Sequence, residues 1–312
     1  MKILKHKYII IILLIINSII NIQIVGARSN KPNEEGLTDL SIVIASCDKY
    51  SGLWEPFFSL LFKHWPSLLD EKLDNQLIKH KIPIFLISNT KTYNKNNNRI
   101  KHMLFPNEIS WSDNMLKTLS KVKTKYVLYL QEDYFLNKPV NEQLLVDILN
   151  YAKINNAMFI QISTFNSRTE KIKKINNNIN LSELDKYSPY KVNLQAGIWN
   201  KQAFEWLIKL DENLVQFEQL GSIRSQGMPG LFLVYTDNNT SPIQYINAAG
   251  AGFLLQTAVD YVHTQGIHFD PKLQQLPVDQ DNKFKIMIMN LKNILIHNLV
   301  KCKNFIIDKF IH

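Results

Sequence analysis

Short apolar runs alternate with amphipathic stretches through the middle of this chain. Residues Ser41–Ser46, Ile82–Ile87 and Tyr126–Leu130 are strand-length runs rich in apolar, β-branched and aromatic types. Such runs are typical of strands buried on both faces of a parallel sheet. Between the first two, Trp54–Trp65 carries apolar residues at helical spacing. Strand, helix and strand in this order predict a parallel βαβ unit at the start of an α/β domain.

The third run is followed at once by polar and acidic residues, Gln131, Glu132 and Asp133. Two acids at the end of a buried strand are costly unless a ligand or another group compensates them. In open α/β sheets the carboxyl ends of the strands are also where ligands bind. The structural alternative is that both acids only end the strand and cap the segment that follows.

The remaining pattern predicts further helices and strands in mixed order. A helix from Trp111 to Val122 leads into the acidic strand, with Ser112 as its N-cap and Asp113 in its first turn. Beyond the acids we expect helices at Glu142–Lys153, at Lys201–Leu210 and around Val259, and strands at Met158–Ile162, Val192–Ile198, Leu231–Tyr235 and Gln244–Ile246. The predicted fold class is therefore α/β, a mostly parallel sheet flanked by helices.

The segment SDNMLKTLSKVKTKYVLYLQEDYFL resembles the part of GT-A-fold, family-2-like glycosyltransferases that carries their acidic Asp-x-Asp motif. The resemblance runs with gaps from Leu40 to His268. It implies a GT-A-like fold and inverting transfer of a sugar from a nucleotide-diphosphate sugar to a glycan or lipid-linked acceptor. In the family the motif holds Mn²⁺ or Mg²⁺ on the diphosphate. Here Gln131 takes the place of the first Asp, and a neutral amide is a poor ligand for a hard cation beside carboxylates. We therefore expect chelation to reduce activity less than in an Asp-x-Asp enzyme.

The resemblance also implies roles for individual residues. Asp133 and Glu218 are the expected catalytic acids, with Glu218 in the chain position of the base that deprotonates the acceptor in inverting members. Asp133 and His263 are the candidate metal ligands. The candidates for binding the nucleotide sugar are Ser46, Asp48, Tyr50, Asn89, Asp113, Glu132 and Arg224. In a metal-independent variant, Arg224 would neutralise the diphosphate with its permanently charged fork.

Structural alternatives accompany these candidates. Asp48 and Asp113 are also suited to capping, a lone histidine such as His263 is more often structural, and Glu218 could be a surface residue of a short helix. If Glu218 is instead desolvated beside Phe217, its pKa would rise toward the working pH. The function that competes with catalysis is a degenerate GT-A domain that binds carbohydrate without turnover, which the loss of the first Asp supports.

Composition and charge limit the function classes. The chain has 312 residues, 46% hydrophobic and 20% charged, which are globular values. Its net charge of +9 suits a phosphate-bearing partner, whereas the scattered basic residues argue against nucleic acid. No Gly-x-Gly-x-x-Gly follows the first strand, which argues against a dinucleotide site. Cys47 and Cys302 are the only cysteines, so there is no disulfide framework.

The two ends of the chain differ from its middle. Residues 1–27 are basic and then apolar, which predicts a signal anchor or a cleaved signal peptide. With either signal we expect a cytoplasmic N-terminus and a translocated domain, either membrane-bound through a single pass or secreted. Residues 28–39 form a predicted stem, 40–270 the GT-A-like domain, and 271–312 a basic amphipathic tail. The tail is expected to pack on its own domain or to lie on a membrane surface.

Overall fold

The computed structural model describes residues 36–69, 72–73, 76–77, 82–94, 99–107, 110–163, 173–176, 179–237, 239–250, 252–269 and 278–279. The predicted N-terminal signal, most of the stem and nearly all of the tail lie outside these residues, so their assignment stays a prediction. Among the residues that are described, no helix is both long and apolar enough to cross a membrane.

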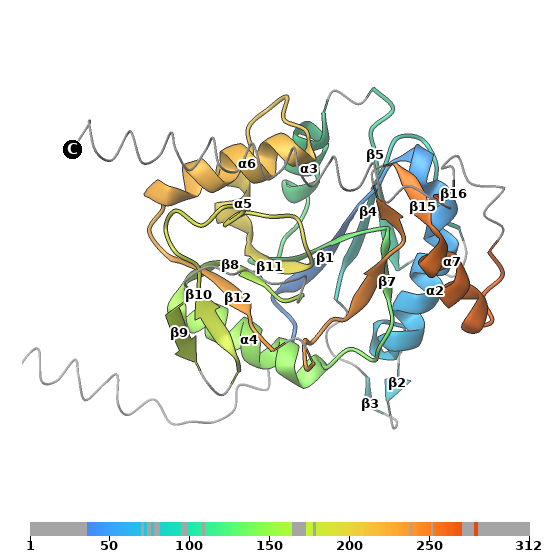
Figure 1. Cartoon of the computed structure of the whole chain (residues 1–312), viewed down its shortest axis with the longest axis horizontal. Helices are drawn as coiled ribbons and strands as arrows, with labels where there is room; N and C mark the ends of the chain where they lie inside the picture. Colours follow the sequence, from blue (N-terminus) through green and yellow to red (C-terminus); the bar gives the residue numbers. More distant parts are fainter. Residues whose placement is uncertain are drawn as a thin grey trace, which may run out of the picture. The chain divides into compact units, whose positions relative to one another are not determined.

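A nine-stranded sheet forms the centre of the domain, in the order β5-β4-β1-β6-β11-β8-β12-β10-β9 (Figure 1). Strands β1, β4, β5 and β6 run parallel to one another, as do β8 and β12, whereas β11 runs antiparallel between β6 and β8. This mostly parallel sheet flanked by helices confirms the predicted fold class. The strands are β1 Leu40–Ala45, β4 Ile84–Ser88, β5 Ile100–Leu104, β6 Tyr126–Gln131, β8 Ala157–Gln161, β9 Lys173–Asn176, β10 Leu181–Glu183, β11 Gly197–Asn200 and β12 Leu231–Tyr235.

Helices cover both faces of the sheet because its central strands are apolar on both sides. On β1, Ile42 and Ile44 belong to the core under α2, α4 and α7, whereas Val43 belongs to the core under α3, α5 and α6. The helices are α2 Trp54–His64, α3 Trp111–Leu119, α4 Glu142–Asn155, α5 Lys201–Leu207, α6 Leu214–Arg224 and α7 Gln256–Thr264. Short 3₁₀ turns are η1 Asp48–Leu53, η2 Pro66–Leu68 and η3 Ser225–Gly227.

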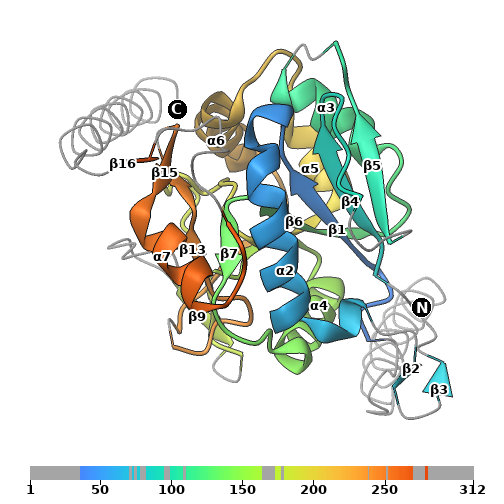
Figure 2. The same ribbon diagram turned by 90° about the vertical axis from the view of Figure 1, so that its right-hand side faces the viewer.

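A small ribbon follows the acidic residues. Strand β7, Tyr134–Leu136, pairs antiparallel with β13, Tyr245–Asn247, with Asn247 opposite Tyr134. Figure 2 shows this ribbon between α2 and α7. The chain then continues into β14 Ala249–Gly250 and β15 Phe253–Leu255, and β15 pairs with β16 Val278–Asp279. A separate hairpin consists of β2 Lys72–Leu73 and β3 Gln76–Leu77.

Two local predictions were wrong. The N-cap of α3 is Ser110, whose side chain accepts a bond from the Asp113 N–H, whereas Ser112 lies buried within the helix. The strand expected from Val192 begins only at Gly197. Val192 and Leu194 bond to side chains of α6 instead of to a neighbouring strand, so the apolar run reflects burial without a sheet ladder.

Candidate active site

Glu132 and Asp133 form the turn between β6 and β7, which we call the acid turn, at the carboxyl edge of the sheet. Glu132 is buried, with 7% of its surface exposed. Asp133 is partly exposed, but its Oδ1 is buried and has no hydrogen-bond partner among the described residues. A buried carboxylate oxygen without a donor costs free energy that a bound cation or ligand donor would recover. The structure therefore places the acids where a ligand would stabilise them.

Burial also changes the protonation of the acid turn. It raises the pKa of Asp133 to about 7, against the opposing effect of backbone N–H groups that include that of Ala249. Burial, and then the charge of Asp133, raise the pKa of Glu132 well above its usual range. Both shifts make full ionisation of the pair unfavourable unless a positive charge compensates it.

Of the predicted nucleotide-binding residues, the structure brings Tyr50 to the acid turn. The Tyr50 phenol is half-buried after β1. Burial raises its pKa, and the charges of Glu132, Cys47 and Asp133 raise it further. The same loop contains Ser46, whose Oγ accepts a bond from Trp54 Nε1 at 2.8 Å. Tyr50 thus lies near enough to the acid turn for the charges of both acids to act on its phenol.

Asp48 and Asn89 join the loops that follow β1 and β4. The Asp48 carboxylate accepts bonds from the backbone N–H groups of Asn89 at 3.1 Å, Thr90 at 3.0 Å and Lys91 at 3.0 Å, and from Thr90 Oγ1 at 2.6 Å. Asn89 Oδ1 accepts in return from Asp48 N at 2.9 Å. Burial opposes these bonds, yet they hold the pKa of Asp48 below its usual range. Both residues therefore tie the loops after β1 and β4 together at the carboxyl edge of the sheet.

Glu218 reaches the same edge from α6. Its Oε1 accepts a bond from the Leu194 N–H at 2.8 Å, in the segment that enters β11. Because β11 is antiparallel, its first residue Gly197 pairs with Tyr129 near the carboxyl end of β6. Burial raises the pKa of Tyr129, and the charges of both Glu132 and Glu218 add to this effect. The charges of the candidate base Glu218 and of Glu132 in the acid turn therefore both influence the pKa of the buried Tyr129.

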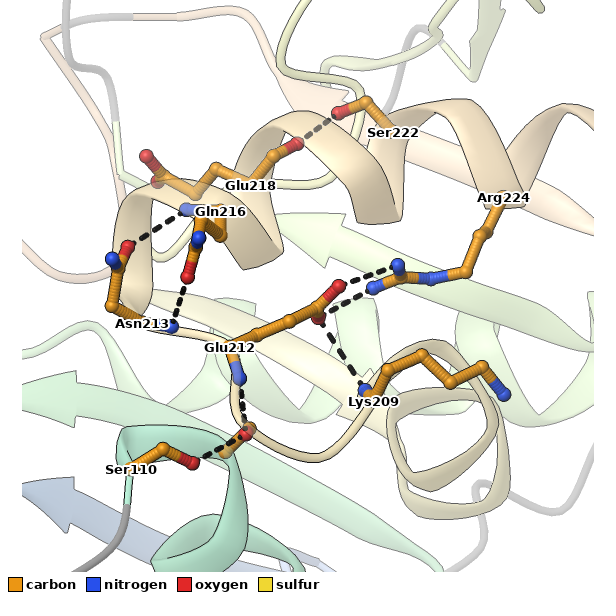
Figure 3. Close-up of polar contacts among 9 residues, drawn as sticks. Ser110, Lys209, Glu212, Asn213, Gln216, Glu218, Ser222 and Arg224 are labelled. Carbon is orange, nitrogen blue, oxygen red and sulfur yellow. Dashed lines mark hydrogen bonds and ion pairs between the residues drawn. The ribbon is translucent and has the colours of Figure 1, made fainter.

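A capping box fixes where α6 begins. Asn213 Oδ1 accepts from the Gln216 N–H at 3.0 Å, and Gln216 Oε1 accepts from the Asn213 N–H at 2.9 Å (Figure 3). The reciprocal bonds satisfy two backbone donors that a helix start otherwise leaves unpaired. Further along the helix, Ser222 Oγ donates to the Glu218 carbonyl at 2.6 Å and accepts from the Val192 N–H at 3.0 Å. Glu218 and Ser222 therefore tie the middle of α6 to the segment before β11.

A second link between Glu218 and the acid turn passes through Leu194. The Leu194 carbonyl accepts from Tyr134 Oη at 2.8 Å, and Tyr134 directly follows Asp133. Tyr245 stacks on Tyr134 with ring centroids 4.3 Å apart and donates to Gln195 Oε1 at 2.6 Å. Sequence reasoning missed Tyr245 and Gln195 because no motif marks them and the contact spans 50 residues.

No hydrogen bond or ion pair joins the two predicted metal ligands, Asp133 and His263, in the described part of the chain. His263 is exposed on α7, and its Nε2 lies 2.9 Å from the Phe269 carbonyl oxygen. Within the described residues, no three His, Cys, Asp or Glu side chains form a group that could hold a metal ion. Gln131 donates from Nε2 to Tyr129 Oη at 3.1 Å. The unpartnered Asp133 Oδ1 nevertheless fits a cation, because Mg²⁺ in phosphate sites commonly uses only one or two carboxylates beside the phosphates and water.

Arg224 is held by Glu212, away from the direction in which Glu218 points (Figure 3). Its Nη1 and Nη2 donate to the two Glu212 carboxylate oxygens at 2.6 and 2.7 Å. The backbone N–H of Glu212 donates in turn to Ser112 Oγ at 3.0 Å, and that of Asp211 to Asp113 Oδ2 at 3.1 Å. Arg224 therefore fastens the α5–α6 loop to α6, and Ser112 and Asp113 fasten it to α3. Sequence reasoning gave no indication of this pairing.

Replacing Arg224 with methionine should destabilise the fold by about 3 kcal/mol, because it leaves the Glu212 carboxylate buried and unpaired. The Glu212 side chain is only 8% exposed. Chemical denaturation checks the value. The matched control is Glu205→Gln, which breaks the more exposed 3.9 Å pair with Lys201 and should cost less than about 1 kcal/mol. Equal, small effects of both variants would contradict a structural role for the Arg224 pair.

No family model matches the chain, and no curated protein matches it. Solved structures do resemble it. S. aureus TarS 1-349 aligns with 67% of this chain and 60% of its own at 10% identity, with a TM-score of 0.44. The same protein in complex with UDP covers 66% of this chain and 59% of its own at 11% identity and a TM-score of 0.42.

A third similar structure is CMP:2-keto-3-deoxy-manno-octonic acid synthetase complexed with CTP. It covers 73% of this chain and 98% of its own at 10% identity, with a TM-score of 0.36. The chain spans about three-fifths of the length of the TarS structures that it matches. These likenesses concern the fold alone.

Proposed function

We propose that this chain is an inverting glycosyltransferase that moves a sugar from a nucleotide-diphosphate sugar to a hydroxyl of a glycan or lipid-linked acceptor. The observation that carries the proposal is the convergence of three carboxylates, Glu132, Asp133 and Glu218, on the carboxyl edge of the sheet. Ligands bind at this edge in open α/β sheets. A purely structural role would not require the buried, unpartnered Asp133 Oδ1.

In this proposal, the loops after β1 and β4 and the acid turn bind different parts of the donor. The loops tied together by Asp48 and Asn89 hold the nucleotide, with Tyr50 between them and the acid turn. Asp133 faces the diphosphate. A Mn²⁺ or Mg²⁺ ion, when bound there, would supply the charge that neutralises the leaving group. Asp133 would hold this ion.

Glu218 acts as the base. Its carboxylate takes the proton of the acceptor hydroxyl while that oxygen attacks the anomeric carbon. The bond from this carbon to the diphosphate oxygen breaks, and its electron pair leaves with the phosphate. One displacement from the opposite face inverts the configuration. The Leu194 N–H, bonded to Oε1 at 2.8 Å, fixes the carboxylate for this step.

A donor screen tests the binding half of this proposal. The full chain should gain thermal stability from nucleotide sugars of one nucleotide class, with Mn²⁺ present, because a ligand that binds only the folded state stabilises it. Asp133→Asn should lose most of this gain. No gain from any uridine, guanosine, cytidine or thymidine diphosphate sugar would count against a nucleotide-sugar site.

We also propose that the domain is translocated, as the basic residues Lys2, Lys5 and Lys7 before the apolar run indicate. In sealed vesicles with a lumenal orientation, the domain should resist protease until detergent is added. Digestion without detergent would place the domain on the cytoplasmic side.

A further inference from the structure

A tyrosine close to Glu218 has a backbone conformation that tyrosine rarely adopts. Tyr190 has a φ of 50°, in the left-handed region, whereas the other non-glycine residues with positive φ in the described chain are Asn or Asp. Asn and Asp tolerate this region because their short polar side chains bond locally, but a bulky aromatic residue adopts it only under strain. Such strain persists only where surrounding contacts impose it, and it is concentrated at functional sites.

A buried asparagine holds Tyr190 in this conformation. Asn193 is 3% exposed, and its Nδ2 donates to the Tyr190 carbonyl oxygen at 3.1 Å and to Gln161 Oε1 at 3.0 Å. Its Oδ1 accepts from the Gln195 N–H at 3.1 Å. Gln161 is the last residue of β8. Asn193 therefore anchors the turn at Tyr190 to the carboxyl edge of the sheet.

The segment after this turn packs closely along α6. The Val192 N–H donates to Ser222 Oγ at 3.0 Å, and a Cβ on Gly221 would lie only 3.1 Å from Val192 Cγ1. Two residues further on, the Leu194 N–H donates to Glu218 Oε1 at 2.8 Å. These contacts fix the position of the turn relative to the candidate base.

The Tyr190 side chain reaches the same part of α6. Burial raises the pKa of its phenol, a hydrogen bond with the Gln219 side chain opposes this rise, and the charge of Glu218 adds to it. The phenol oxygen is therefore engaged by the residue next to the candidate base, whereas the side chain as a whole remains partly exposed. An aromatic ring whose polar tip is held by the protein offers its apolar face to a ligand. The C–H groups on one face of a sugar ring fit such a surface.

We propose that the ring of Tyr190 is the floor of an acceptor-sugar subsite, on which the acceptor packs with one hydroxyl facing Glu218. This inference deepens the proposed function and rests on it for the identity of the sugar as the acceptor. Because Asn193 and the contacts with α6 fix the turn before any ligand binds, the acceptor would meet a ring that is already in position.

Tyr190→Gly removes the ring and keeps the turn, because glycine adopts positive φ without strain. Saturation-transfer NMR on the full chain measures binding of a panel of methyl glycosides of hexoses, N-acetylhexosamines and deoxyhexoses. The wild type should bind at least one of them, and Tyr190→Gly should weaken that affinity at least about tenfold. Tyr190→Phe keeps the ring and removes only the phenol oxygen, so its affinity should lie within about threefold of the wild type.

Tyr187→Gly is the matched control. Tyr187 belongs to the same segment, three residues before Tyr190, and is 39% exposed. This variant should bind the glycosides as the wild type does. Wild-type affinity in Tyr190→Gly, or an equal loss in Tyr190→Phe, would overturn the subsite. Failure of the wild type to bind any glycoside of the panel would overturn it as well.

The kinetics of transfer distinguish a binding role from a structural one. Loss of binding that is equal in the ground state and the transition state raises the acceptor KM of Tyr190→Gly with little change in kcat. A fall in kcat at unchanged KM would show that Tyr190 only holds Glu218 in place, and would overturn the subsite. No release of nucleoside diphosphate by the wild type would count against the proposed transferase, whereas the glycoside titration would still decide the sugar subsite.

Discussion

Replacing Glu218 with glutamine should lower the turnover number ~100- to 10,000-fold, the range that a general base contributes. Glutamine retains an oxygen that can accept the Leu194 N–H bond now made at 2.8 Å, so the segment before β11 should keep its position. Donor affinity should barely change, because the lost interaction belongs to the transition state. Steady-state release of nucleoside diphosphate and a calorimetric donor titration measure the two quantities.

Glu205→Gln serves as the control for charge removal, because it changes the same residue type on the neighbouring helix α5. It should leave turnover and donor affinity unaltered. Near-normal turnover in Glu218→Gln would remove Glu218 from the mechanism. The base would then have to be sought at Asp237, which bonds Thr240 Oγ1 at 2.7 Å, or at Asp260, which bonds Gln256 Nε2 at 2.7 Å.

Replacing Asp133 with asparagine should weaken donor binding in the presence of metal and, at the same time, make the metal-free protein more stable at high pH. Burial raises the pKa of Asp133 to about 7 in the folded state, against a usual value of 3.8. Between these two values the folded state binds more protons than the unfolded state, so the free energy of unfolding falls as the pH rises.

This loss is complete above the folded pKa and absent below the unfolded one. Since Asp133 is partly exposed, we expect asparagine to recover about 2 kcal/mol at pH 8 and almost nothing at pH 4. Denaturant unfolding at both values measures the difference. Asp147→Asn, which removes an exposed carboxylate on α4, should change stability little at either pH. An equally small, pH-independent effect of Asp133→Asn would contradict a strained acid turn.

The central strands and the acid turn could be predicted because burial on both faces leaves a continuous apolar run. Ser41–Ser46 and Tyr126–Leu130 correspond closely to β1 and β6, and the interruption at Glu132 correctly marks the edge of the sheet. Helical spacing likewise identified α2. These features depend on neighbours along the chain, so a local pattern contains them.

The contacts that decide individual roles depend instead on distant partners. Arg224 bonds Glu212 because α6 folds back beside the preceding loop, and a sequence pattern cannot distinguish this arginine from one that binds phosphate. Tyr245 stacks on Tyr134, beside the acid turn, only because β13 pairs with β7, more than 100 residues away in sequence. The N-cap of α3 is Ser110 and not Ser112, because the Ser112 side chain instead accepts a bond from the Glu212 N–H of the α5–α6 loop.

Release of free nucleoside diphosphate from the donor that binds tests the central claim most directly. The full chain, incubated with that nucleotide sugar, Mn²⁺ and a mixture of glycan acceptors, should release it with many turnovers per molecule, and Glu218→Gln should release it far more slowly. Tight donor binding with no release by the wild-type chain, over the whole acceptor mixture, would contradict the transferase and identify a carbohydrate-binding protein instead.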